Sequence, residues 1–389
     1  MTKHKVAVVG AGHGKFGKRA DASIRELAFE SATQAYEDAG VDPKTDIDAS
    51  VVTLAGDQFN GQGAPAAVIN DAVGHPHVPT LRVEAACASG TAGIRTAYGW
   101  VAAGLYDVVA VIGVEQMTRL ETPVTTELMS RAGDLRWEFP FGISFPSFYA
   151  LYASAHMAEF GTTREQLSMV GVKNHHYGAK NPKAHLRKEV SLEEAVNAFI
   201  VAYPLNLYDC SLISDGSATL ILANAEKAKK MTDTPIWITG VGSGGSQNML
   251  SDRPHLFGLE GAVRAGKIAY KMAKVEPKDI DFAELHDCFT IAEIMAYEDL
   301  GFCKKGEGGK FIEDQESYIG GKLPANVDGG LKSKGHPVGC TGVSQGYEIT
   351  KQLRGEADEG RQVPNATRGL CHNVGQSGQF VNVIIYERD

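Results

Sequence analysis

A cysteine and a histidine lie in two segments that could bring a nucleophile and a base together. Cys87 lies within residues 83–93, where an apolar β-strand pattern passes through small residues into a helical pattern. Unpaired N–H groups and the dipole at a helix start favour the thiolate form of a cysteine. We therefore predict that Cys87 is a nucleophile with a lowered pKa. An inert, buried cysteine is the alternative interpretation of this residue.

The histidine is His336, which is flanked by Gly335 and Gly339 and precedes a helical pattern over residues 344–353. Glycines of this kind allow a tight loop from which an imidazole can project. The loop lies in the second half of the chain roughly where Cys87 lies in the first. If these two elbows face each other, they form a Cys–His pair, the minimal arrangement of an activated nucleophile. A structural histidine that caps the loop is the alternative.

Two further segments carry polar side chains near the end of a predicted strand. One contains His286, Asp287 and Cys288, and the other contains Cys371 and His372. Buried polar groups cost free energy unless they are paired or used, so these residues are site candidates. Their spacing matches no zinc motif, so we predict that the site holds no metal. The alternative is a metal site built from His286, Cys288, His336 and His372.

The elements that must position these residues follow an alternating plan. Apolar, β-branched runs alternate with helical patterns, which is typical of an α/β protein. Residues 39–48 and 273–281 share the pattern Ala-x-Val-acid-Pro-Lys followed by Asp-Ile-Asp, each between a predicted helix and a predicted strand. A chance match of two similar turns is possible, but the shared length and context favour an internal duplication.

The duplication predicts three regions. The first half comprises residues 1–118 and 208–234, and the second half comprises residues 235–389. Residues 119–207 break the alternation with aromatic and proline clusters and a helical pattern over 149–160, so we predict a loop domain inserted over the active site. A basic stretch within it is either a solvated surface or a site for substrate phosphates, with the candidates Lys173, Lys180, Lys183 and Arg187.

Composition restricts the class of protein. The chain has 389 residues, a formal net charge of −9 and 43% hydrophobic residues, as expected of a globular protein that does not bind nucleic acid. No run of apolar residues is long enough to cross a membrane, and the N-terminus lacks a signal-peptide pattern, so we predict a cytoplasmic protein. Six cysteines at irregular spacing predict no disulfide framework.

The four motifs together resemble the thiolase superfamily over essentially the whole chain. The family's Cys-x-Ser-Gly motif corresponds to residues 87–90, and its Gly-His-Pro motif corresponds to residues 335–337, followed by Gly-x-Thr-Gly at 339–342. This resemblance implies an α/β thiolase fold, with duplicated βαβαβαββ halves in five layers, αβαβα, and an inserted loop domain. It also implies an acyltransferase that uses coenzyme A thioesters as substrates and holds no permanent cofactor.

Two departures place the resemblance within a subgroup. Residues 286–289 are His-Asp-Cys-Phe where biosynthetic thiolases carry Asn-Glu-Ala-Phe, and residues 372–375 are His-Asn-Val-Gly where those enzymes carry Cys-x-Gly. Both features look like sterol-carrier-protein-2-type thiolases and archaeal acetoacetyl-CoA thiolases. In that subgroup the second catalytic cysteine comes from the His-Asp-Cys-Phe loop. Cys288 is therefore our candidate acid/base, and Cys371 is a weaker candidate.

The resemblance also implies roles for the remaining residues. His336 takes the proton of Cys87, which attacks one acyl-CoA, and His336 with His286 stabilises the enolate of the second. The backbone N–H of Cys87 and one near Gly375 would bind the tetrahedral oxyanion of the acyl group. His372 is counted with the catalytic residues. The implied reaction is the condensation of two acetyl-CoA molecules to acetoacetyl-CoA, the reaction that feeds the mevalonate pathway.

Other activities and partners follow from the same resemblance. A thiolase for longer 3-ketoacyl chains and a retro-aldolase are the alternatives, although the related aldolases lose the nucleophilic cysteine. A hydroxymethylglutaryl-CoA synthase needs a glutamate base that neither loop supplies. The resemblance implies a homodimer or homotetramer, with strand 108–114 near a two-fold axis. It also implies a possible complex with hydroxymethylglutaryl-CoA synthase and a zinc-ribbon/OB-fold protein.

Overall fold

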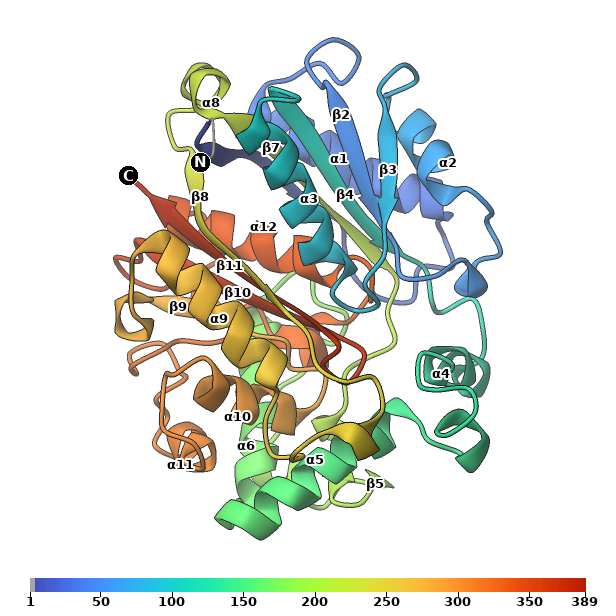
Figure 1. Cartoon of the computed structure of the whole chain (residues 1–389), viewed down its shortest axis with the longest axis vertical. Coiled ribbons are helices and arrows are strands. Elements are labelled where there is room, and N and C mark those ends of the chain that lie inside the picture. Colours follow the sequence, from blue (N-terminus) through green and yellow to red (C-terminus); the bar gives the residue numbers. More distant parts are fainter. Residues whose placement is uncertain (1–3) are drawn as a thin grey trace.

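The computed structural model describes residues 4–389 and joins nine strands in one sheet, in the order β3-β2-β4-β7-β1-β8-β11-β10-β9 (Figure 1). These strands are β1 (Val6–His13), β2 (Ala49–Thr53), β3 (Thr80–Val83), β4 (Val108–Glu115), β7 (Gly216–Asn224), β8 (Ile236–Gly244), β9 (Phe282–Glu284), β10 (Arg368–Gly375) and β11 (Phe380–Arg388). A second, two-stranded sheet consists of β5 (Ile200–Ala202) and β6 (Leu205–Asn206).

The helices are α1 (Ile24–Ala39), α2 (Pro65–Ala72), α3 (Ser89–Ala103), α4 (Thr122–Ser130), α5 (Phe145–Phe160), α6 (Arg164–Lys180), α7 (Leu192–Val196), α8 (Ala225–Met231), α9 (Glu260–Ala273), α10 (Thr290–Asp299), α11 (Gly308–Glu313) and α12 (Thr341–Arg354). A short π-helical turn, η6 (Gly330–Lys334), precedes the His336 loop. Within residues 4–389, no helix is both long and apolar enough to cross a membrane.

The pairing of strands repeats on either side of the antiparallel contact between β1 and β8. In the first half β1 pairs with β7, and β7 pairs with β4, both antiparallel. In the second half β8 pairs with β11, and β11 pairs with β10, again both antiparallel. The next strand in each half is parallel to its neighbour: β2 pairs with β4, and β9 pairs with β10. β3 ends the first half, and its counterpart in the second half is a single parallel bridge between Ala283 and Ala325. This repeated pairing confirms the predicted duplication.

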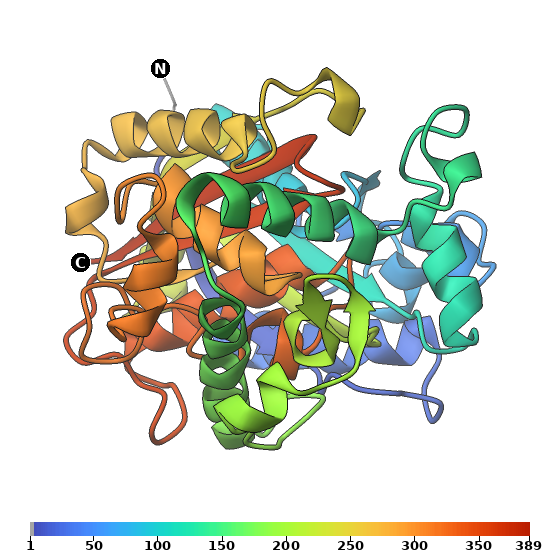
Figure 2. The same cartoon turned by 90° about the horizontal axis from the view of Figure 1, so that it is seen from below.

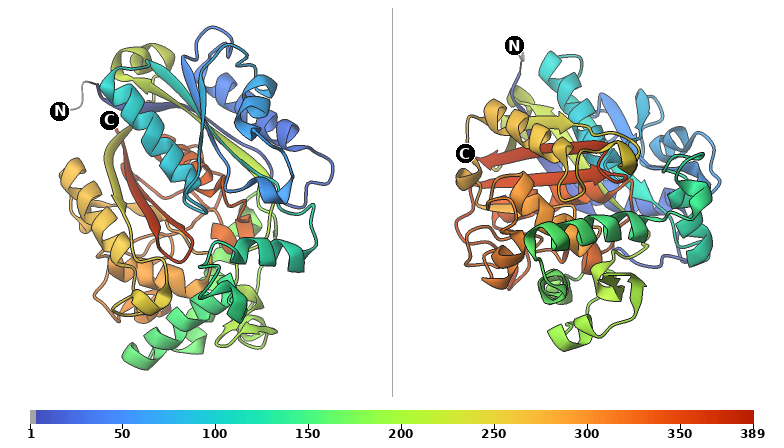
Figure 3. Two further views of the ribbon diagram at one scale, coloured as in Figure 1. Left: turned by 45° about the vertical axis from the view of Figure 1, so that its right-hand side comes forward. Right: turned by 60° about the horizontal axis from the view of Figure 1, so that its bottom comes forward.

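The helices form three layers with the two halves of the sheet between them. α3 and α12 lie in the middle, where Ile94 and Val343 share one core cluster with strands of both halves. α1 covers the outer face of the first half and α9 covers that of the second half (Figures 1 and 3). Strands inside the sheet, such as β2, β4 and β7, are buried on both faces and therefore carry continuous apolar runs rather than alternating ones. The predicted five-layer α/β fold is therefore confirmed.

Two glycines allow α3 and α12 to approach each other closely at their N-termini. A Cβ atom on Gly90 would lie 2.6 Å from the backbone nitrogen of Gly342, and one on Gly342 would lie 2.3 Å from the backbone nitrogen of Thr91. Only glycine fits such an approach of two backbones. The positive ends of two helix dipoles consequently meet beside the loops that carry Cys87 and His336.

The segment between β4 and β7 contains α4 to α7 and the small sheet, and α5 and α6 cross the lower side of the molecule (Figure 2). The helix that we predicted over residues 149–160 is α5, which begins four residues earlier because Ser144 and Ser147 form a capping box. The division into regions 1–118 with 208–234, 119–207 and 235–389 stays a prediction, and its first three residues lie outside those described.

The expected position of strand 108–114 near a two-fold axis stays a prediction, but this strand is not an edge through which two sheets could pair. β4 lies inside the sheet, hydrogen-bonded to β2 on one side and β7 on the other. A buried strand with two neighbours has no free backbone groups to offer a second chain. The edge strand of the first half is β3, where the side chain of Leu81 is 46% exposed.

Candidate active site

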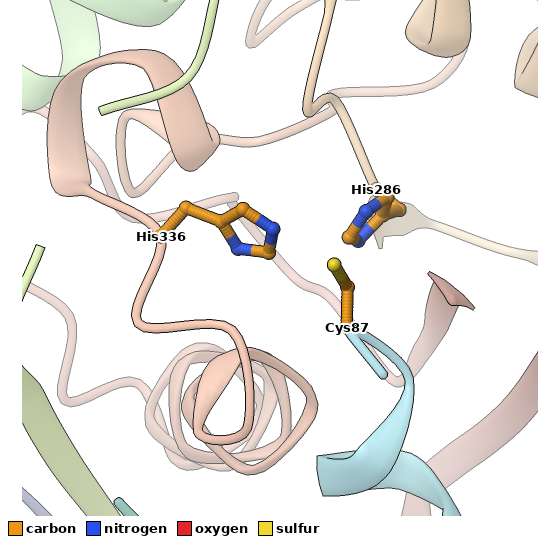
Figure 4. Close-up of side chains that lie close together, drawn as sticks. All are labelled: Cys87, His286 and His336. Carbon is orange, nitrogen blue, oxygen red and sulfur yellow. The ribbon is translucent and has the colours of Figure 1, made fainter. Parts of the chain in front are cut away.

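Three side chains from both halves of the chain meet in one buried cluster (Figure 4). Cys87 follows β3, His286 follows β9, and His336 lies between η6 and α12. The sulfur of Cys87 and one ring nitrogen from each histidine all lie within 4.8 Å of one another. The structure therefore brings together the cysteine and the histidine of the two elbows, and adds His286 beside them.

The Cys87 elbow is a strained turn that its neighbours hold in place. Ala86 has a φ of 49°, in the left-handed region that residues other than glycine rarely adopt. The hydroxyl of Ser89 accepts a hydrogen bond from the backbone N–H of Ala85 at 2.9 Å and donates one to the carbonyl of Ala86 at 2.6 Å. Strain of this kind persists only where the surroundings impose it, and it is concentrated at functional sites.

A second strained turn faces this elbow from the end of β10. A Cβ atom on Gly375 would lie 2.2 Å from the carbonyl oxygen of Ala85, so only glycine permits the contact. The next residue, Gln376, has a φ of 56°, and its backbone N–H is directed at the sulfur of Cys87. The sequence analysis expected an oxyanion donor near Gly375, and the N–H of Gln376 is the candidate for it; that role stays a prediction.

The prediction of a lowered pKa for Cys87 is wrong for the unliganded protein. Burial raises the pKa of the Cys87 thiol well above its ordinary value, and the nearby Cys288 adds to the shift, while the backbone N–H of Gln376 opposes it. Burial likewise lowers the pKa of His336 to about 3, with further contributions from Lys332 and Lys334. Desolvation outweighs the helix dipole here. The resting pair is therefore a neutral thiol beside a neutral imidazole.

The other ring nitrogens of the two histidines are hydrogen-bonded to different neighbours. His336 Nδ1 lies 2.7 Å from the hydroxyl of Thr341, and His286 Nδ1 lies 3.0 Å from Nδ2 of Asn373. The Nε2 atoms of both rings are buried and have no hydrogen-bond partner among the described residues. Unsatisfied buried nitrogens are rare in folded proteins, and here they border the Cys87 sulfur.

Cys288 lies beside Cys87, whereas Cys371 does not. Cys288 is buried just before α10, next to Tyr149, whose ring stacks on Phe289 with 4.7 Å between centroids. Burial raises the pKa of the Cys288 thiol to about 12, and a hydrogen bond with Tyr149 opposes this shift. Cys371 lies in the core of the middle layer, with its sulfur 3.3 Å from Oε1 of Gln345.

His372 is buried on β10, one residue before Asn373, and neither of its ring nitrogens has a hydrogen-bond partner among residues 4–389. Burial lowers its pKa to about 3. Successive side chains of a strand point to opposite faces, so His372 and Asn373 cannot share one environment. The residue of this motif that contacts His286 is Asn373, which the sequence analysis did not single out. The alternation of the strand was the signal that could have indicated it.

The alternative metal site of the sequence analysis, built from His286, Cys288, His336 and His372, differs from the cluster that the structure contains. The cluster with metal-binding geometry in the described chain consists of Cys87, His286 and His336. Cys288 and His372 are not part of it.

Glu115 was also missed, and it ties the His336 loop to the first half. One carboxylate oxygen accepts hydrogen bonds from the backbone N–H of Ala55 at 2.7 Å and of Gly339 at 3.0 Å. Burial raises the pKa of Glu115 to about 8. Because this carboxyl group already binds two loops, we assign it to holding the His336 loop against the loop that follows β2.

The prediction that Lys173 binds substrate phosphate is corrected by the structure. Lys173 is fully buried on α6, where its ammonium group pairs with Glu293 and donates a hydrogen bond to the carbonyl of Ala325 at 2.6 Å. A buried ion pair of this kind cannot release its cation to a ligand without leaving an uncompensated charge. Lys173 therefore anchors α6 to the second half.

The remaining basic candidates also lie away from Cys87. Lys183 donates hydrogen bonds to the carbonyl of His13 at 2.6 Å and to Gln34 at 3.0 Å, and Lys180 contacts His176 at 2.9 Å. Arg187 is exposed on the surface. None of the four lines the pocket at Cys87, whose one basic lining residue is Arg131. A role for Lys180, Lys183 or Arg187 in binding substrate stays a prediction.

The pocket that opens onto Cys87 has a volume of about 430 Å³. Its walls are mostly apolar and come from both elbows, from the loop after β2 and from α4 and α5. The lining residues are Ala55, Gln58, Phe59, Glu84, Ala86, Cys87, Leu128, Met129, Arg131, Ala132, Phe145, Val338 and Gln376. A small acyl group next to the sulfur fits such a pocket.

Comparison with known proteins agrees with this geometry. Residues 6–226 match the family model "Thiolase, N-terminal domain", and residues 242–388 match "Thiolase C-terminal domain-like". The chain is 44% identical to an acetyl-CoA acetyltransferase of Methanothermobacter thermautotrophicus, over 98% of this chain and 99% of that protein. It is 42% identical to the protein of the same name from Methanocaldococcus jannaschii, over 98% of each chain.

More distant relatives include other thiolase-like proteins. Sterol carrier protein 2 of Bos taurus is 32% identical over 99% of this chain and 72% of its own length. A solved structure described as "Ltp2-ChsH2(DUF35) aldolase" has a TM-score of 0.85 at 26% identity, and covers 99% of this chain and 98% of that one. The two family models together cover nearly all of the sequence, and the duplicated fold and the Cys87 elbow agree with them. This chain belongs to the thiolase family and is an acyltransferase.

Proposed function

We propose that this protein is a thiolase that condenses two acetyl-CoA molecules reversibly to acetoacetyl-CoA and CoA through an acyl-Cys87 intermediate. The observation that carries the proposal is the position of the Cys87 sulfur within 4.8 Å of a His336 ring nitrogen, at the floor of an open pocket. The relatives named acetyl-CoA acetyltransferase supply the substrate class. The reaction uses CoA thioesters as substrates and needs no permanently bound cofactor.

In the first step, His336 removes the thiol proton of Cys87, and the thiolate attacks the thioester carbonyl. The backbone N–H groups of Cys87 and Gln376 face the oxyanion that forms, because both are directed at the reacting sulfur. The carbon–sulfur bond to CoA then breaks. The departing CoA thiolate takes a proton from Cys288, which leaves an acyl-Cys87, a Cys288 thiolate and a protonated His336.

In the second step, the Cys288 thiolate removes a proton from the methyl carbon of a second acetyl-CoA. A raised thiol pKa makes the thiolate a stronger base, which suits the abstraction of a weakly acidic C–H proton. The enolate oxygen is stabilised by the paired histidines while its carbon attacks the acyl group. Cys87 leaves as a thiolate and recovers its proton from His336, so the enzyme returns to its starting state.

The direct test measures cleavage of acetoacetyl-CoA by the purified protein, with and without free CoA. We expect acetyl-CoA to form only when CoA is present, because CoA is the acceptor of the second acyl group. A series of longer 3-ketoacyl-CoA substrates tests the chain length, and we expect the four-carbon substrate to have the highest kcat/KM. Absence of CoA-dependent cleavage for every chain length would contradict the proposal.

A retro-aldolase is the rival activity, since a solved aldolase has the same fold. A retro-aldol reaction splits a 3-hydroxyacyl-CoA into a carbonyl compound and a shorter acyl-CoA, and it consumes no free CoA. The position of the Cys87 thiol beside a neutral histidine favours acyl transfer over this reaction. Product formation that is independent of CoA would favour the aldolase.

We further propose that the protein acts as a homodimer, or a pair of dimers, formed through the edge strand β3. This edge carries the exposed side chain of Leu81 and lies next to the Cys87 elbow. A free edge strand can pair with the same strand of a second copy about a two-fold axis. Light scattering should give about twice the chain mass of 41.6 kDa or a higher multiple, and a mass of one chain would contradict the proposal.

We also propose a larger assembly with hydroxymethylglutaryl-CoA synthase and a zinc-ribbon/OB-fold protein. The same proposal includes a cytoplasmic location and a reaction that supplies the mevalonate pathway. Condensation of two thioesters is unfavourable, so direct transfer of acetoacetyl-CoA to a consuming enzyme would draw the reaction forward. Co-purification from the native host would reveal such chains.

A further inference from the structure

We propose that the active site holds its two histidines in opposite tautomers: Thr341 fixes His336 as a hydrogen-bond acceptor at Nε2, and Asn373 fixes His286 as a donor there. Both Nε2 atoms are buried and lack partners among the described residues, and one ring nitrogen of each histidine lies within 4.8 Å of the Cys87 sulfur (Figure 4). A neutral imidazole carries one proton, so a donor at one nitrogen requires an acceptor at the other. The inference rests on the proposed thiolase function for its kinetic consequence only.

The tautomer of His336 follows from the hydroxyl of Thr341. This hydroxyl donates its hydrogen to the carbonyl of Pro337 at 3.1 Å, as side chains in the first turn of a helix often do. Its oxygen can then only accept from His336 Nδ1, which lies 2.7 Å away. His336 therefore has its proton on Nδ1 and a free lone pair on Nε2. That lone pair is what a base needs to remove the proton of Cys87.

The tautomer of His286 follows from a chain of side-chain hydrogen bonds. Asn382 Nδ2 donates to the hydroxyl of Thr91 at 3.1 Å. The hydrogen of this hydroxyl has two acceptors within reach, Oδ1 of Asn373 at 3.0 Å and the carbonyl of Ala88 at 3.1 Å, and the orientation of the amide described below favours Asn373. The other end of the Asn373 amide, Nδ2, then donates to His286 Nδ1 at 3.0 Å. With a lone pair on Nδ1, His286 carries its proton on Nε2.

The crossing of α3 and α12 favours this orientation of the Asn373 amide. Its Oδ1 lies only 2.5 Å from where a Cβ atom on Gly342 would be, and it accepts from Thr91 in the first turn of α3. Both helix N-termini are positive ends of dipoles, so they attract the carbonyl oxygen of the amide rather than its NH₂ group. The two helices thus orient the amide, and the amide orients the proton of His286.

The two tautomers divide the chemistry at the site. His336 Nε2 accepts the proton of Cys87, whereas the N–H at His286 Nε2 donates to the enolate oxygen of the second thioester. Asn373 and Thr341 touch neither the sulfur nor the substrate, and are positioning residues that act through the histidines. The arrangement also resists metal ions, because His286 Nε2 has no lone pair to offer although the cluster has the ligand types that Zn²⁺ prefers.

The test replaces Asn373 by residues of different polarity. In Asn373→Asp the carboxylate must accept from His286 Nδ1, so the proton moves to that nitrogen and Nε2 gains a lone pair. We expect kcat for condensation to fall by about 10²–10³-fold, the scale of one lost oxyanion donor. Acetylation of Cys87 by acetyl-CoA should stay within a few-fold of the wild-type rate, since His336 is unchanged.

A second test of the His286 tautomer measures metal binding and does not require the enzyme to be active. Co²⁺ added to Asn373→Asp should bind with the absorption bands of a tetrahedral thiolate complex, because Cys87, His286 and His336 then all offer lone pairs. Wild-type protein should show no such bands. Asn373→Ala removes the amide and fixes neither tautomer of His286, so it should bind Co²⁺ more weakly than Asn373→Asp does. ¹⁵N spectra of the histidine rings in the wild type should report a proton on Nε2 of His286 and on Nδ1 of His336.

Either of two results would overturn the proposal. Tetrahedral Co²⁺ bands in the wild type would mean that the Asn373 amide has the reverse orientation. Equal losses of condensation in Asn373→Asp and Asn373→Ala, without Co²⁺ binding in the first, would reduce Asn373 to a packing role. If the wild type has no thiolase activity but the spectra agree, the proposed function fails and the tautomer assignment stands.

Discussion

Cys87→Ala is expected to lower the turnover of acetoacetyl-CoA by about 10⁴-fold or more, because the covalent route is lost with its nucleophile. The variant should also fail to acquire an acetyl group. After brief incubation of the wild type with acetyl-CoA, mass spectrometry of its peptides should locate an acetyl adduct on the peptide that contains Cys87. Burial raises the pKa of the Cys87 thiol and lowers that of His336, so it disfavours the charged forms of both groups in the free protein.

Cys303→Ala is a suitable control, since Cys303 is a partly buried thiol on the second half, apart from the cluster. It should retain both the adduct and the turnover of the wild type. A Cys87→Ala enzyme that still splits acetoacetyl-CoA would rule out the acyl-enzyme route. That result would favour the aldolase, whose mechanism needs no nucleophilic sulfur.

The architecture could be predicted because its signals are local. The turns at residues 39–48 and 273–281 have the same sequence pattern, and in the structure they follow α1 and α9, which cover equivalent faces of the two half-sheets. The turns at Cys87 and His336 could also be predicted, because glycine and other small residues indicate a turn whether it is buried or exposed. Cys87 and His336 occupy equivalent positions in the two halves, so a symmetric arrangement of the halves predicts that these two residues lie close together.

What the sequence could not supply depends on burial and on partners far apart in the chain. The pKa of Cys87 is set by desolvation, which outweighs the local helix start that favoured the thiolate. Lys173 belongs to a run of basic residues, yet its partner Glu293 lies 120 positions away on α10. Asn373 is adjacent to His372, but only the register of β10 decides which of the two meets His286.

The different surroundings of two cysteines support our proposal that Cys288, and not Cys371, is the second acid/base. Cys288 is close enough to Cys87 to raise its pKa, and Tyr149 forms a hydrogen bond with it. Cys371 has a structural partner instead, because Gln345 binds its sulfur and also donates hydrogen bonds to the carbonyls of Glu284 and His372. This contact ties α12 to β9 and β10 within the core, and Cys371 does not line the pocket at Cys87.

Cys288→Ala should therefore reduce condensation and thiolysis by about 10²-fold or more, the scale of a lost general acid/base. Transfer of an acetyl group to Cys87 should continue, measured as the adduct formed in a single turnover, because the nucleophile and His336 remain. Cys371→Ala should keep activity within a few-fold and lower the free energy of unfolding by about 1–2 kcal/mol, since it loses a buried contact. If Cys371→Ala proved the more damaging change for condensation, the roles of the two cysteines would have to be exchanged. Loss of acetyl transfer in Cys288→Ala would instead place Cys288 in the first step, as the group on which departure of CoA depends.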